Sequence, residues 1–250
     1  MTYPDTETYY VNWAGGSSGS FISTLIAKLI YQIDKPIELS EYGNAHANSE
    51  MIKSNWKYNY PASYTEPIYL RVSPINPTIP FLMYQEIFTD ATPNWDTLFN
   101  IYPKCKNVII TLTKEDEPLR ELNHYYKFLC DNDEFPEHFW NMVKRKVPEF
   151  KQFSNPKEAP VELIKKYINR PNFLPGVGPV SSRLHFSDSK IIPNKYKDNI
   201  VRIKFHDIIF NMKLVLETLG DVTKRPIPEI IKTEYQQYLA KQQILIDKFL

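Results

Sequence analysis

Two hydrophobic patterns alternate along this chain. Short continuous runs rich in β-branched residues predict buried strands of a parallel sheet, whereas apolar residues repeated every three or four positions predict helices. The predicted strands are residues 8–14, 67–72, 107–113 and 199–205, and the predicted helices are residues 21–30, 118–129, 138–147, 159–168, 208–219 and 229–250. This alternation predicts an α/β fold with a doubly wound parallel sheet and helices on both faces.

The length of the chain fits one domain with an interruption. A chain of 250 residues is typical of a single large α/β domain, so we expect one domain over residues 1–250. A mixed, proline-containing stretch at about 131–189 indicates an insertion or lid. Residues 81–88 are apolar, but their pattern does not separate a strand from a helix. Gly220 directly follows the predicted helix 208–219 and is its expected C-cap.

A glycine-rich turn joins the first predicted strand to the first predicted helix. Its residues are Gly15, Gly16, Ser17, Ser18, Gly19 and Ser20. A helix N-terminus presents backbone N–H groups and the positive end of a dipole, which suit a phosphate or sulfate group, and the serine hydroxyls would add donors. The phosphate loop of nucleotide hydrolases ends in Gly-Lys-Ser/Thr, whereas Gly19 is followed by Ser20 and Phe21 here. The turn therefore predicts an anion site without the usual lysine; a turn that only packs strand against helix is the structural alternative.

Composition narrows the function further. Lysine and arginine total 30 against 29 acidic residues, so the net charge of +1 gives no argument for nucleic acid or a membrane surface as partner. No apolar run reaches the roughly 20 residues of a membrane helix. The two cysteines and five histidines form no metal pattern, so no metal is expected. We expect a protein of the reduced cytoplasmic compartment.

Three segments, in this order, resemble the P-loop sulfotransferases, which transfer a sulfuryl group from 3′-phosphoadenosine 5′-phosphosulfate (PAPS) to a hydroxyl or amine. The first is the glycine turn between strand and helix, where that family binds the 5′-phosphosulfate. The second is the strand and charged turn 108–116 with the helix segment 122–128, similar to the family's 3′-phosphate site. The third is 201–208 followed by 215–220. The compact form is similar to small sulfotransferase-like proteins of phages and large viruses.

The resemblance implies a nucleotide-type donor, PAPS, and a hydroxyl or amine acceptor whose identity the sequence does not give. Thr113 and Lys114 stand where the family has an arginine after the third strand, and Asn123 or His124 stands where a serine is expected, so the resemblance implies that Thr113 and Asn123 bind the donor. Lys114 is our candidate for the missing phosphate-binding cation, and Arg183 is a second candidate from the later loop. His46 is the candidate general base, because histidine titrates near neutral pH; a loop histidine bonded to backbone is the structural alternative.

Two other interpretations stay open, and with them the question of whether the chain is an enzyme. A non-catalytic nucleotide-binding, anion-binding or structural protein on the same fold would explain the missing lysine in the turn. A nucleotide or small-molecule kinase ranks lowest, because no clear magnesium-binding aspartate follows the third predicted strand, where Asp116 belongs to a charged turn.

Overall fold

The computed structural model describes residues 8–13, 16–32, 81–86, 99, 103–126, 137–168 and 194–250. The predicted strand 67–72 lies outside these ranges. The predicted domain extent and the lid character of 131–189 remain predictions, although residues 137–168 within that stretch are described.

Four parallel strands form one sheet in the order β2-β1-β3-β4. The strands are β1 (Thr8–Trp13), β2 (Phe81–Glu86), β3 (Lys106–Thr111) and β4 (Ile200–Lys204). In the register, Val11 lies opposite Val108 and Val108 lies opposite Val201. The strands predicted near the start of the chain, at 107–113 and at 199–205 are confirmed, and the undecided segment 81–88 contains a strand.

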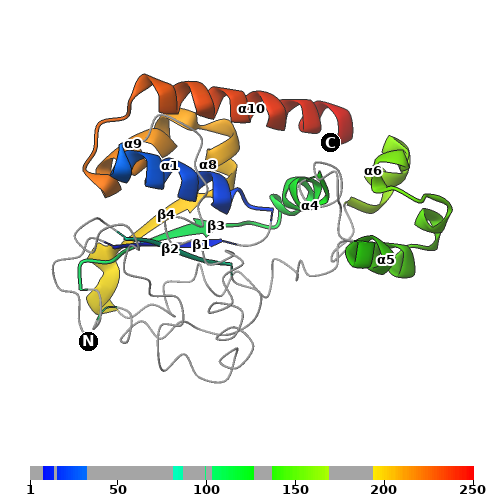
Figure 1. Cartoon of the computed structure of the whole chain (residues 1–250), viewed down its shortest axis with the longest axis horizontal. Helices are drawn as coiled ribbons and strands as arrows, with labels where there is room; N and C mark the ends of the chain where they lie inside the picture. The colour runs from blue at the N-terminus through cyan, green and yellow to red at the C-terminus, as the bar shows by residue number, and fades with distance from the viewer. Residues whose placement is uncertain are drawn as a thin grey trace.

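The α-helices follow the predicted order along the chain, and short 3-10 helices that were not predicted lie between them. They are α1 (Gly19–Tyr31), α4 (Glu117–Tyr125), α5 (Glu137–Lys146), η3 (Pro148–Gln152), η4 (Pro156–Glu158), α6 (Val161–Ile168), η6 (Asn194–Asn199), α8 (Phe205–Phe210), α9 (Met212–Thr223) and α10 (Glu229–Phe249). Figure 1 shows α1, α8, α9 and α10 over one face of the sheet, with α4, α5 and α6 beyond the ends of the strands. The described residues thus form an α/β structure with a parallel sheet, whereas helices on the opposite face remain a prediction.

The predicted helix 208–219 is in fact two helices, and Gly220 is not a C-cap. Asn211 separates α8 from α9, and its side chain accepts a hydrogen bond from the backbone N–H of Leu214 as an N-cap. α9 runs through Gly220 to Thr223 and ends at Lys224, which adopts the left-handed conformation with φ of 53°. The helix continues past Gly220 because Val222 packs into the core.

Two hydrophobic cores lie side by side, and α10 contributes to both. The first lies between the sheet and the helices α1, α8, α9 and α10, and includes Tyr235. The second is built around the fully buried Trp140 of α5, with side chains from α4, η3 and α6, and includes Phe249 from the last turn of α10. The C-terminal helix therefore ties the helical unit 137–168 to the sheet.

Acidification is expected to destabilise this helical unit through Glu149. The Tyr167 hydroxyl donates to Glu149 and, together with a backbone hydrogen bond and Lys166, lowers the pKa of this carboxyl from 4.5 to about 2. A carboxyl with a lower pKa in the folded chain stabilises it above the unfolded pKa, and this stability is lost as the pH falls from about 4.5 to about 2. We expect Glu149→Gln to flatten the fall in melting temperature across that interval, measured by circular dichroism. The exposed Glu162→Gln should keep the wild-type slope, and an unchanged slope for Glu149→Gln would contradict the assignment.

Candidate functional site

The glycine turn lies at the carboxyl end of β1, an interior strand of the sheet. The chain passes from β1 to β2 on one side, and then to β3 and β4 on the other side of β1. Ligands of parallel α/β sheets bind outside the carboxyl ends of the strands, at the point where the strand order reverses in this way. The fold therefore brings the turn before α1 and the turn after β3 to the edge of the sheet where such ligands bind.

Gly16 contacts the backbone of α4 so closely that no side chain fits there. Its φ is +83°, and a Cβ built on it would overlap the carbonyl oxygen of Arg120 and lie 3.1 Å from the carbonyl carbon. The side-chain Nδ2 of Asn123 donates a hydrogen bond of 3.3 Å to the Gly16 carbonyl oxygen. Gly16 thus packs turn against helix, and Asn123, predicted to bind the donor nucleotide, bonds to the turn itself.

The other described residues of the turn lead into α1 or begin it. Ser17 and Gly19 are buried, Gly19 and Ser20 begin α1, and Ser18 is the N-cap residue in the left-handed conformation, with φ of 66°. An N-cap serine usually accepts a hydrogen bond from the first turn of its own helix. The Ser18 side chain makes no such bond; its hydroxyl is hydrogen-bonded to the hydroxyl of Tyr238 in α10. The first turn of α1 is therefore not capped by the serine at its start.

Aromatic contacts hold α10 against this end of α1. Phe21 stacks on Tyr238 with ring centroids 3.9 Å apart, and it meets the ring of Tyr235 edge-on at 5.1 Å. The Tyr235 hydroxyl donates to the carbonyl oxygen of Ile208 at 2.9 Å. Burial raises the pKa of both tyrosines well above the usual value, so both hydroxyls keep their protons. Further along α1, buried Lys28 forms an ion pair with Glu234.

Asp116 shapes the turn after β3. Its Oδ2 accepts hydrogen bonds from the Thr113 backbone N–H at 2.7 Å and from the Thr113 hydroxyl at 3.0 Å. A backbone hydrogen bond is the main cause that lowers the pKa of Glu115, and the Thr113 hydroxyl makes a smaller contribution. Lys114 is exposed. The Thr113 donors predicted for a ligand thus bond within the turn, and Lys114 is an exposed cation just before α4.

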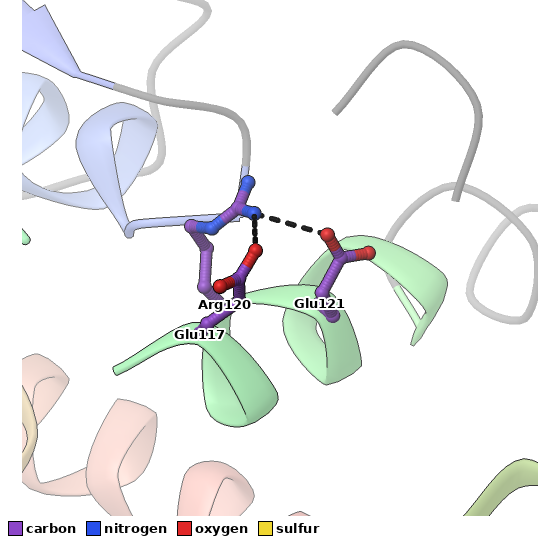
Figure 2. Close-up of polar contacts among 3 residues, drawn as sticks. All are labelled: Glu117, Arg120 and Glu121. Carbon is purple, nitrogen blue, oxygen red and sulfur yellow. Dashed lines mark hydrogen bonds and ion pairs between the residues drawn. The ribbon is translucent and has the colours of Figure 1, made fainter. Parts of the chain in front are cut away.

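A fully buried arginine that was not among the predicted site residues lies next to the glycine turn. The Arg120 side chain of α4 is fully buried, and its Nη2 lies 3.0 Å from Glu121 Oε1 and 3.6 Å from Glu117 Oε1. Figure 2 shows both carboxylates converging on one nitrogen of the guanidinium. A signal was available, because Arg120 precedes Asn123 by three positions and so shares its helix face.

The structure brings together only part of the predicted site. Gly16 meets Asn123 directly, Ser18 meets Tyr238, and the turn with Thr113 and Lys114 leads into the helix that contacts Gly16. The other predicted site residues, Gly15, His46 and Arg183, lie outside the described residues.

Comparison with known proteins gives no further guide. No protein-family model and no curated protein matches this chain. Within the described ranges, no three His, Cys, Asp or Glu side chains are grouped so that they can hold a metal ion. In the same part of the chain, no helix combines the length and apolar character needed to cross a lipid bilayer.

Proposed function

We propose that this chain binds a nucleotide through a phosphate or sulfate group at the glycine turn, as a P-loop protein of sulfotransferase type. One observation carries the proposal: α1 begins at a glycine turn beyond the carboxyl end of β1, and the Ser18 hydroxyl does not cap it. Backbone N–H groups at the start of a helix, together with the helix dipole, suit an oxyanion. The doubly wound sheet with helices on both faces belongs to the same proposal, which the order β2-β1-β3-β4 supports.

The reaction in this proposal is transfer of a sulfuryl group to a hydroxyl or amine acceptor. PAPS would supply the activated sulfuryl group, with its phosphosulfate held at residues 15–20. Lys114 or Arg183 would neutralise charge on the departing phosphate, and His46 would accept the proton of the attacking hydroxyl or amine. Such transfer depends mainly on positioning and charge stabilisation, as phosphoryl transfer does.

Titration with adenosine 3′,5′-bisphosphate, the desulfated product of PAPS, tests the binding step. We expect micromolar affinity by calorimetry and no binding of ATP. Lys114→Ala should weaken binding about 10- to 150-fold, since a hydrogen bond to a charged group contributes about 1.5–3 kcal/mol. Lys241→Ala, which removes an exposed lysine of α10, is the matched control and should leave affinity unchanged. Equal affinity for ATP would argue against a sulfotransferase-type site.

The second candidate function is a non-catalytic binding or structural protein on the same fold. Its support is that donors around the turn already have partners within the chain: Ser18 bonds to Tyr238, Thr113 bonds to Asp116, and Arg120 pairs with carboxylates. Absence of binding for both nucleotides would favour this candidate. Binding of the bisphosphate without sulfuryl transfer to any acceptor would favour its nucleotide-binding form.

A further inference from the structure

The two carboxylates at Arg120 are held unequally. Glu121 is fully buried and hydrogen-bonded to Nη2 at 3.0 Å. Glu117 lies 3.6 Å from the same nitrogen, beyond ordinary hydrogen-bond distance, and its side chain is 20% exposed. Its buried Oε1 accepts no hydrogen bond from the residues that the structure describes. Glu117 is therefore the more weakly held partner of the arginine.

The backbone and Cγ of Arg120 lie against the glycine turn. The described turn residues 16–20 contain no lysine or arginine, and Gly16 packs directly against Arg120. A guanidinium presents a planar fork of N–H donors that matches phosphate and sulfate oxygens. Among the residues that the structure describes, one positive charge is paired here with two negative charges, so an added oxyanion would be repelled unless one carboxylate left.

We propose that Arg120 is the cation of the anion site and that Glu117 occupies its guanidinium until the oxyanion of a phosphate or sulfate ester replaces the Glu117 carboxylate. Glu121 stays paired and keeps the arginine in place. The ligand group is a phosphate or sulfate, and this inference rests on the anion site of the proposed function. Glu117 leaves readily because it sits in the first turn of α4 and is partly exposed, so its carboxylate reaches water without movement of the helix.

The test is the affinity for adenosine 3′,5′-bisphosphate and for inorganic sulfate, measured by calorimetry. Glu117→Gln removes the competing charge and should tighten binding of both probes about fivefold, the effect of losing one modest ion pair. Arg120→Lys should weaken both at least tenfold, because a lysine lacks the planar fork. Glu162→Gln, an exposed carboxylate of α6, is the matched control and should change neither.

The outcomes separate this inference from the proposed function. If the wild-type protein binds the bisphosphate and Glu117→Gln leaves the affinity unchanged or weakens it, replacement of the Glu117 carboxylate by the oxyanion is wrong, whereas the nucleotide site stands. If the wild type binds neither probe but Glu117→Gln binds one, this replacement is supported. Absence of binding in both overturns both ideas. A gain of affinity is a result that a purely structural ion pair would not give, and Glu117→Gln stays informative even if Arg120→Lys fails to fold.

Discussion

Gly16→Ala is expected to destabilise the protein by about 2–5 kcal/mol. The left-handed region costs a residue with a Cβ about 1–2 kcal/mol, and overfilling a packed site costs about 1–3 kcal/mol more. Both apply here, because φ is +83° and the new Cβ would overlap the backbone of Arg120, which cannot rotate away. Denaturant unfolding followed by circular dichroism measures the loss.

Gly220→Ala is the matched control, with the opposite expected sign. Gly220 lies inside α9, where a Cβ would make ordinary contacts at 3.4 Å with the Arg225 carbonyl oxygen and at 3.6 Å with Ile227. Alanine in a helix interior is favoured over glycine by about 0.8–1 kcal/mol, so stability should stay equal or rise. If both variants lose the same free energy of unfolding, the close contact of Gly16 with α4 is not the cause of the destabilisation.

Arg120→Met is expected to cost about 3–5 kcal/mol, because it leaves the buried carboxylate of Glu121 without its cation. The double variant Arg120→Met/Glu121→Leu should recover most of this loss, since apolar side chains of similar size often replace a buried ion pair at little cost. Arg145→Met, on the exposed end of α5, should change stability by less than about 0.5 kcal/mol. The denaturant concentration at the unfolding midpoint, compared at a constant dependence of the free energy on denaturant, measures the stability of each variant. If Arg120→Met/Glu121→Leu is as unstable as Arg120→Met, the buried carboxylate is not the cause of the loss.

The elements predicted most accurately are those whose buried side chains form a regular pattern along the sequence. The β-branched run of β3 and the spaced apolar residues of α1 gave elements correct to within two residues. β2 stayed undecided because its Phe, Leu and Met residues suit a helix or a strand equally. The break between α8 and α9 was missed since the apolar spacing runs across it, although Asn211 before an apolar run is an N-cap signal.

The candidate site was predicted only in its local part. Glycine density identifies the turn, but contacts with distant segments decide what its groups bond to. Asn123 reaches Gly16 across 107 positions of the chain, and this distance is closed by tertiary packing that no local pattern encodes. Arg120 shares a helix face with Asn123, but its burial depends on the same tertiary packing.

The contact between Ser18 and Tyr238 has a consequence for the timing of protein synthesis. The two residues are 220 positions apart, and Lys28 and Glu234 are 206 apart. At about 5–20 residues per second, a ribosome needs roughly 10–45 s to pass from one member of such a pair to the other. During that interval α1 and Ser18 are on the nascent chain without α10, and Phe21 lacks its stacking partner. The glycine turn and α1 therefore acquire these native contacts only after the other described strands and helices have been made.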